Sequence, residues 1–338
     1  MNGDQLYENI QAYEHGYAVV VGVGGDLPVT VKDAEGVYGL LVDPERCAYP
    51  PDQVVLLTGE KAGRNGIINA LEDLAEKAQA DPEATIVVFF SGHGVEVPGY
   101  YLIPDGFDLN DLDQTAISGE LFTEMLRNIG AKKLLVFLDC CHAGGQAEAK
   151  GMPGSKSPVP KSLVSDFGKS SGRVLIASSR KNELSWTGQP YSVFTGALLE
   201  ALAGYGASEN DGYSRVLDAA LWIGRQVPNR TGDKQHPILK VSNLEDNFAV
   251  AFYAAGKKRA KKLDWTAPVP AVSPGLDEQF IASRKKMMAN YRDSLMILEE
   301  RMSEFIDFTD IPLQWTKNKR AFEARIADLE EKLGLKQQ

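Results

Sequence analysis

The sequence is poor in cysteine and lacks a long hydrophobic segment. Only Cys47, Cys140 and Cys141 occur among its 338 residues, too few for a disulfide framework, and adjacent cysteines are badly placed to bond each other. No apolar run approaches the ~20 residues that a membrane-spanning helix needs. The first residues, MNGDQLYENIQAYEHG, have neither the basic nor the apolar segment of a signal peptide. We therefore expect a cytoplasmic protein.

An excess of positive charge is also missing. The chain has 36 Lys and Arg residues against 46 Asp and Glu residues, a formal net charge of −10. This balance argues against nucleic acid or an anionic membrane as a partner. One local basic run, Lys257–Lys262, is interpreted as the solvated face of a linker. Hydrophobic residues make up 43% and charged residues 24%, which excludes a wholly disordered chain.

Short apolar runs alternate with amphipathic segments over the first two-thirds of the chain. Runs of this kind, rich in β-branched residues, are typical of strands that are covered on both faces. The alternation predicts an α/β fold with a mostly parallel central sheet and helices on both faces. The expected strands are Tyr17–Val23, Gln53–Leu57, Thr85–Phe90, Lys133–Leu138 and Arg173–Ala177. The expected helices are Asp33–Leu41, Arg64–Ala78, Ser118–Ile129, Ser192–Ala203 and Tyr213–Val227.

Other patterns divide the chain into parts. Residues 146–172 are rich in Gly, Pro, Ser and Lys, which predicts a flexible loop inside the first domain. After residue 276, apolar residues recur at alternating spacings of three and four on either side of Pro312, which predicts a helical hairpin. We expect a catalytic domain (1–255), a basic and proline-rich linker (256–275) and a helical appendage (276–338). The appendage is expected to bind a regulatory protein or a second copy.

Reactive side chains follow two of the expected strands. His93 follows the third strand in SGHG, and Cys141 follows the fourth in DCCHAGG. Because reactive groups gather at the carboxyl ends of parallel strands, we expect His93 to face a cysteine, whose thiolate it would favour. The N–H groups of Gly94 and Cys141 are candidates to hold a developing oxyanion. A zinc site is a weaker alternative, because Cys140 and Cys141 would point to opposite sides, and no metal is expected.

These two motifs together resemble the paired signatures of the caspase-like cysteine peptidases, most closely prokaryotic metacaspase-like proteases. The segments VVVGVG, VLIASS and SVFTGALLEAL resemble other parts of that family, and the similarity runs from Tyr17 to Val250. The resemblance implies a caspase-like α/β fold and a cysteine endopeptidase. In it, His93 matches the catalytic histidine and Cys141 the nucleophile, whereas Cys140 stands where the family usually has a small residue.

The resemblance also implies a primary specificity pocket built from Asp33, Ser91 and Asp139. Carboxylates in a narrow, partly desolvated pocket select the cationic side chain of Arg or Lys. Caspases that prefer Asp use arginines in this pocket, and no matching arginine is evident here. Thr30 stands where the family often has a cysteine, a departure at the rim of the pocket. The predicted activity is cleavage of proteins or peptides after Arg or Lys.

The sequence also suggests how the activity is regulated. The flexible loop directly follows the nucleophile and is expected to be a self-cleavage or substrate-gating segment, with candidate cleavage sites at Lys150, Lys156, Lys161 and Lys169. The family implies regulated proteolysis, started by self-cleavage or an upstream signal, in defence or cell death. No cofactor is expected, with calcium activation as an alternative, because carboxylate oxygens suit calcium and Asp105, Asp108, Asp111 and Asp113 form an acidic stretch. A catalytically idle caspase-like scaffold and a peptide-ligating enzyme are the alternative functions.

Overall fold

The computed structural model describes residues 13–97, 99–140, 172–180, 183, 185–209, 211–242, 244–253 and 263, and in the C-terminal region residues 288–289, 291–293, 295–300, 302 and 313–332. Its strands are β1 (Gly16–Gly22), β2 (Val54–Thr58), β3 (Thr85–Val97), β4 (Gly99–Ile103), β5 (Ile117–Ser118), β6 (Lys133–Cys140), β7 (Arg173–Ala177), β8 (Tyr213–Arg215), β9 (Ile238–Ser242) and β10 (Ala249–Phe252). Its α-helices are α1 (Pro28–Val42), α2 (Arg64–Ala80), α3 (Leu112–Thr115), α4 (Gly119–Asn128), α6 (Val193–Leu202), α7 (Val216–Thr231) and α9 (Leu313–Lys332). Short 3-10 turns are η1 (Pro51–Gln53), η2 (Gly59–Ala62) and η3 (Leu109–Asp111).

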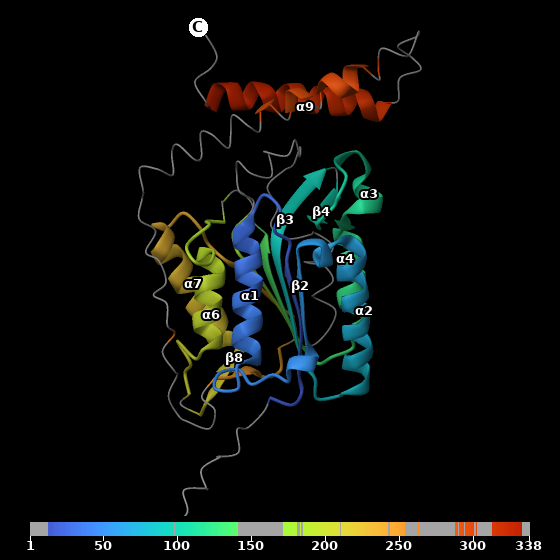
Figure 1. Cartoon of the computed structure of the whole chain (residues 1–338). Helices are drawn as coiled ribbons and strands as arrows, with labels where there is room; N and C mark the ends of the chain where they lie inside the picture. Colours follow the sequence, from blue (N-terminus) through green and yellow to red (C-terminus); the bar gives the residue numbers. More distant parts are fainter. Residues whose placement is uncertain are drawn as a thin grey trace, which may run out of the picture.

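A central sheet with the strand order β2-β1-β3-β6-β7-β9 organises the molecule. The pairs from β2 to β7 are parallel, whereas β9 is antiparallel to β7. Helices α1, α6 and α7 cover one face, and α2 and α4 cover the other (Figure 1). The predicted α/β architecture with a mostly parallel sheet is therefore confirmed.

Two hydrophobic cores lie on the two faces of this sheet. Side chains alternate between the faces along each strand, so neighbouring residues belong to different cores. Val20 and Phe89 lie in the core beneath α1, α6 and α7, whereas Val19 and Val88 lie in the core beneath α2 and α4. All four are at most 1% exposed. Burial on both faces explains why the strands are continuous apolar runs without a polar alternate position.

The third strand is longer than the sequence predicts. Residues 85–92 pair with β6 inside the main sheet, and from His93 onward β3 pairs antiparallel with β4. His93 therefore lies where the strand leaves the main sheet, and the expectation that it follows the end of a strand is wrong. The physical reason is that β4 supplies backbone partners beyond the edge of the parallel sheet.

The prediction of a helix over Tyr213–Val227 is wrong for its first three residues. The segment Tyr213–Val227 begins with β8, which pairs antiparallel with β10, and only then continues as α7. By contrast, α4 and α6 start close to the predicted positions. Ser118 and Ser192 are their N-caps, each accepting a hydrogen bond from the backbone N–H three residues later. These caps satisfy a free N–H group without the glutamate of a capping box.

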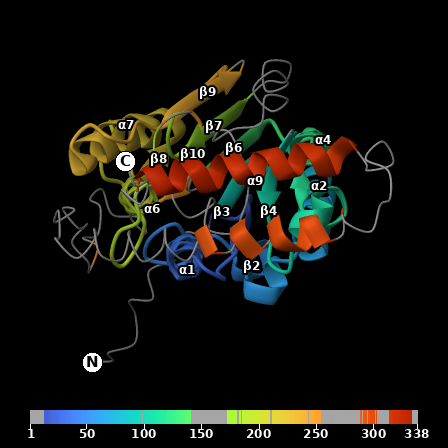
Figure 2. The ribbon, with the colours of Figure 1, turned by 90° about the horizontal axis from the view of Figure 1, so that it is seen from above.

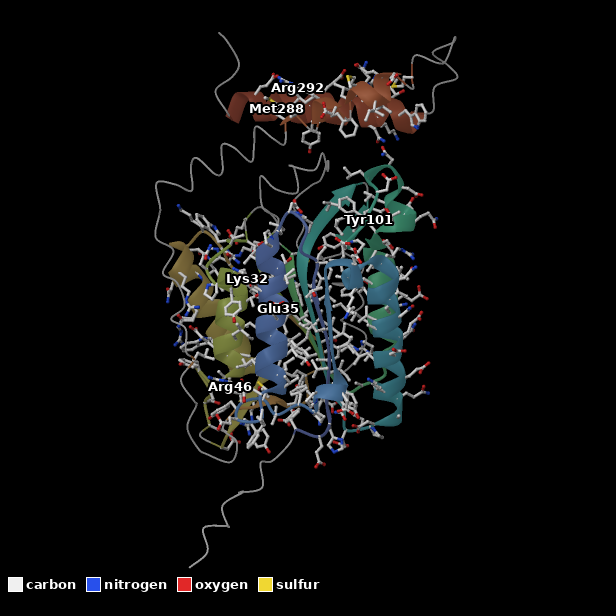
Figure 3. The ribbon with its side chains drawn as sticks, viewed as in Figure 1. Lys32, Glu35, Arg46, Tyr101, Met288 and Arg292 are labelled. Atoms are coloured by element: carbon white, nitrogen blue, oxygen red, sulfur yellow. The ribbon has the colours of Figure 1, made fainter. Side chains whose placement is uncertain are left out.

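The C-terminal helices form the predicted hairpin. Met288 and Tyr291 pack against Phe322 and Ile326 of α9. Ion pairs join Arg292 to Glu330 at 2.9 Å and Lys319 to Glu299 at 2.7 Å, as two antiparallel helices require. Figure 2 shows α9 beside residues 291–300, and Figure 3 labels Met288 and Arg292 in this region. The predicted boundaries at residues 255 and 276 and the basic run 257–262 lie outside the described residues.

Over the described ranges, no helix has the length and the apolar character that crossing a membrane requires.

Candidate active site

The candidate site lies at the edge of the main sheet where the parallel pairing of β1, β3 and β6 ends. The register of the sheet pairs Ser91 with Asp139 and Gly92 with Cys140. His93 directly follows the last of these pairs on β3, and Cys141 directly follows Cys140 in the sequence. Cys141, the predicted nucleophile, lies outside the described residues, as do His142 and the four candidate self-cleavage lysines, Lys150, Lys156, Lys161 and Lys169.

His93 is held by a carboxylate that the sequence analysis missed. Its Nε2 atom lies 3.0 and 3.2 Å from the two carboxylate oxygens of Asp26. Its Nδ1 atom is buried and has no hydrogen-bond partner in the described part of the chain. Asp26 follows β1, the strand next to β3, so the rule that functional groups gather at carboxyl ends was a signal that could have found it.

Cys140 is a core residue. Its side chain is completely buried among the residues beneath α2 and α4. Burial raises the pKa of the Cys140 thiol to about 12, although a hydrogen bond with Tyr100 lowers it. Because the thiolate is the nucleophilic form, Cys140 is unsuited to attack a substrate at neutral pH.

Gly94, a predicted oxyanion donor, lies beside this cysteine. A Cβ atom at position 94 would collide with the phenol oxygen of Tyr100 and lie 3.4 Å from the Cβ of Cys140. A larger residue at position 94 would therefore require the Tyr100 side chain to move.

The structure brings the three predicted pocket residues together. The Ser91 hydroxyl donates to Asp33 at 3.1 Å, and the backbone N–H of Ser192 donates to the same carboxylate at 2.8 Å. Asp139 accepts hydrogen bonds from Ser185 at 3.0 Å, from Thr195 at 2.8 Å and from the hydroxyl of Ser192. Ser192 thus joins the two carboxyls.

The two carboxyls lie in an environment that disfavours their charge. Asp33 and Asp139 are both completely buried. Burial raises the pKa of Asp33 well above its ordinary value, and the neighbouring Asp139 raises it further. Burial also raises the pKa of Asp139, against hydrogen bonds from Ser192, Thr195 and Ser185 that lower it. In the described part of the chain, neither carboxyl contacts a Lys, Arg or His side chain.

Thr30 stabilises a turn. It is completely buried, accepts a hydrogen bond from the Gly24 N–H at 2.8 Å and donates to the Leu27 carbonyl at 2.8 Å. These bonds tie the start of α1 to the segment that carries Asp26. The residue that departs from the family pattern therefore holds the β1–α1 turn.

Two aspartates of the acidic stretch 105–113, the alternative calcium site, accept hydrogen bonds from neighbouring residues. Asp108 accepts a hydrogen bond from the Asn110 N–H at the start of η3. Asp113 accepts one from Tyr101 of β4, which is labelled in Figure 3. Among the described residues, no group of three or more His, Cys, Asp or Glu side chains is arranged to hold a metal ion.

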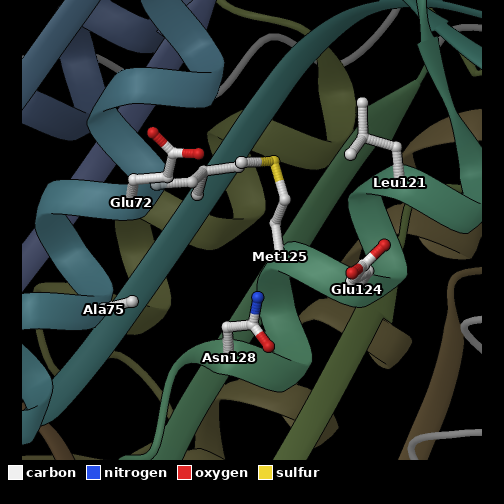
Figure 4. A pocket seen from close by; sticks show the side chains of 7 residues that line it. Glu72, Ala75, Leu121, Glu124, Met125 and Asn128 are labelled. Atoms are coloured by element: carbon white, nitrogen blue, oxygen red, sulfur yellow. The ribbon is translucent and has the colours of Figure 1, made fainter.

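The larger of two cavities in the described part of the chain does not lie at the candidate active site. A cavity of about 270 Å³ lies between α2 and α4 (Figure 4) and is lined by Leu71, Glu72, Ala75, Leu121, Glu124, Met125 and Asn128. None of these residues belongs to the predicted site. A cavity of about 30 Å³ lies beside His93 and Asp26.

Comparison with known proteins decides the family. A family model described as the caspase domain matches residues 15–249. The chain belongs to the caspase-domain family of cysteine peptidases. This caspase-domain match ends at Ala249, the first residue of β10, and leaves the C-terminal helices outside it. No curated protein matches the chain. A crystal structure of a protein from Geobacter sulfurreducens is similar, with 18% identity, a TM-score of 0.47, and coverage of 67% of this chain and 93% of that one.

Proposed function

We propose that this caspase-domain protein is an endopeptidase of the metacaspase type, which cleaves proteins after Arg or Lys by means of Cys141 and His93. The observation that carries this specificity is the pair of buried carboxyls, Asp33 and Asp139, without a cation among the described residues. All of their hydrogen-bond donors are neutral hydroxyl or backbone N–H groups.

A substrate guanidinium or ammonium group supplies the positive charge that this pair lacks. Charge-assisted hydrogen bonds to a carboxylate are about twice as strong as neutral ones. A substrate carboxylate, in contrast, would meet two further carboxyls and no cationic partner among the described residues. Since Asp33 and Asp139 are completely buried, the cation reaches them only when groups that cover them, such as Ser192 at the start of α6, give way.

The proposed chemistry uses His93 as the acid and base. The Cys141 thiol gives its proton to His93, and the thiolate attacks the scissile carbonyl carbon. The oxyanion is stabilised by the N–H groups of Gly94 and Cys141. His93 then protonates the leaving amine as the C–N bond breaks, which leaves an acyl-enzyme that water hydrolyses. The register that pairs Gly92 with Cys140 supports this assignment.

A panel of fluorogenic peptides ending in Arg, Lys or Asp, assayed with and without calcium, tests the proposal. We expect cleavage of Arg and Lys peptides, no activity in Cys141→Ala, and activity in Cys140→Ser. Asp139→Ala should lower the turnover of Arg and Lys peptides by at least about tenfold, because a desolvated cation loses its partner. Faster cleavage of Asp peptides, or an active Cys141→Ala variant, would refute the proposal.

We also propose that the enzyme cuts itself between residues 146 and 172, in response to a signal in a defence or cell-death pathway. The proposal rests on the four lysines of this segment and on its position after Cys141. Intact-mass measurement should show a cut there in the active enzyme and an uncut chain in Cys141→Ala. A single uncut mass in the active enzyme would show that processing is not required.

A further inference from the structure

We propose that Asp26 is a positioning residue that orients His93 and stabilises its protonated form during catalysis. The inference rests on the proposed function in that it takes Cys141 as the nucleophile. No motif of the sequence assigns a role to Asp26, and the proposal comes from its contact with His93.

The contact has the geometry of a directed hydrogen bond. The two atoms that meet are Nε2 of His93 and a carboxylate oxygen of Asp26, 3.0 Å apart. The His93 side chain is 4% exposed and that of Asp26 is 31% exposed. The imidazole is thus enclosed, whereas the carboxylate remains partly exposed to water.

The backbone before Asp26 forms a tight, braced turn. Gly24 and Gly25 have φ angles of 78° and 66°, in the left-handed region that favours glycine. The Gly24 N–H is held by Thr30, and the Leu27 N–H donates to the Gly24 carbonyl at 3.1 Å. This turn brings Asp26 to His93, 67 residues later in the chain.

The contact decides which nitrogen of His93 carries the proton. A carboxylate accepts only, so Nε2 must donate to Asp26, which leaves the lone pair of neutral imidazole on Nδ1. That buried Nδ1 has no partner among the described residues and is therefore free to accept the thiol proton. When the proton arrives, the Asp26 carboxylate stabilises the imidazolium cation. Asp105 is the other titratable group lining the small cavity beside His93, and no hydrogen bond joins it to the ring.

Kinetics of Asp26→Asn, Asp26→Glu and a control, Asp105→Asn, test the role. Asp26→Asn should lower kcat by at least about tenfold with KM changed by less than about twofold, since substrate contacts are intact. Its pH–rate profile should also differ from that of the wild type, because the protonated ring loses its carboxylate partner. Asp26→Glu should restore part of the loss, and Asp105→Asn should retain wild-type kcat. An unchanged kcat and pH profile in Asp26→Asn would overturn the inference.

Alkylation of Cys141 by iodoacetamide separates this inference from the proposed function, because it needs no substrate. Peptide mapping by mass spectrometry distinguishes Cys141 from the buried Cys47 and Cys140. Slower alkylation of Cys141 at neutral pH in Asp26→Asn, with an unchanged melting temperature, supports the inference even if no Arg or Lys peptide is cleaved. Equal alkylation rates in the wild type and Asp26→Asn overturn it, even if those peptides are good substrates.

Discussion

At the scale of single residues, Asp33 and Asp139 are two carboxyls whose charged forms are disfavoured in the folded protein. Both are completely buried, and burial raises the pKa of each. A carboxyl whose pKa is higher in the folded state binds its proton more tightly there than in the unfolded chain. Folding is therefore favoured at low pH, and this stability is lost as the pH rises from the ordinary value of 3.8 through the raised pKa of Asp33.

We predict that Asp33→Asn stabilises the protein at neutral pH and damages cleavage. The amide removes the buried charge and its repulsion with Asp139, and it still offers an oxygen to the Ser192 N–H. The melting temperature at pH 7.5 should rise by about 2–4 °C, the shift that ~1 kcal/mol produces in a large domain. Circular dichroism measures this shift, and hydrolysis of Arg peptides should fall at least about tenfold.

The pH dependence is the control for this prediction. The stabilising effect of Asp33→Asn should shrink as the pH is lowered from 7.5 toward 4, because burial raises the pKa of Asp33 and so favours the protonated carboxyl in the folded state. A lower melting temperature at pH 7.5, or an effect that is equal at both pH values, would show that the charge of Asp33 does not limit stability.

At the scale of elements, helices α6 and α7 are joined by a largely buried polar group. Arg230 of α7 donates to both carboxylate oxygens of Glu200 in α6, at 2.6 and 2.7 Å. The indole N–H of Trp222 donates to the same carboxylate at 3.0 Å. Glu200 is 8% exposed, so its removal leaves two donors with little access to water.

We predict that Glu200→Ala destabilises the protein by ~3 kcal/mol, the usual cost of leaving a buried charge without its partner. Urea unfolding measures this change. Glu200→Gln should cost less, because its amide oxygen still accepts one hydrogen bond.

The matched control is Glu83→Ala. Glu83 pairs with Lys133 at 3.6 Å, and its side chain is 68% exposed. An exposed pair of this kind is worth less than ~1 kcal/mol. Equal losses of stability in Glu83→Ala and Glu200→Ala would refute the view that burial makes the α6–α7 contact important.

At the scale of the whole molecule, residues near the start of the chain are hydrogen-bonded to β10, at the end of the caspase domain. The Tyr13 hydroxyl donates to the Ala249 carbonyl at 2.7 Å, and the Tyr49 hydroxyl donates to the Val250 carbonyl. Val250 and Leu263 both belong to the core beneath α1, α6 and α7. The C-terminal hairpin, in contrast, buries Tyr291 against its own residue Phe322.

We therefore predict that a chain ending after residue 265 folds and cleaves peptides at a rate within about threefold of the full chain, because the site lies before β10. Its activation or its association with partners should change, since the appendage is proposed to regulate or recruit. Circular dichroism, peptide hydrolysis and analytical ultracentrifugation measure these properties.

A chain ending after residue 245 is the control, and it should not fold, because it loses β10 and the backbone acceptors of Tyr13 and Tyr49. If the chain ending after residue 265 were also unfolded, the hairpin would be part of the catalytic core and the division into parts would be wrong.

The fold class and the family could be predicted from the sequence because their signals are local. An apolar run followed by an amphipathic segment is enough to indicate a strand and a helix. The motifs around His93 and Cys141 each occupy a few consecutive residues, and they were enough to indicate a caspase-like peptidase, a family that the comparison confirms. The 3-4 spacing after residue 276 likewise predicted the hairpin.

Features that depend on contacts between distant residues were decided by the tertiary structure alone. The strand at Tyr213–Arg215 depends on pairing with β10, which lies far along the chain beyond α7 and β9. The contact of Asp26 with His93 joins the turn after β1 to β3, and the enclosure of Asp139 depends on hydroxyls more than 40 residues later in the chain. Local periodicity carries no record of such hydrogen bonds, because their partners meet only when the sheet and its helices assemble.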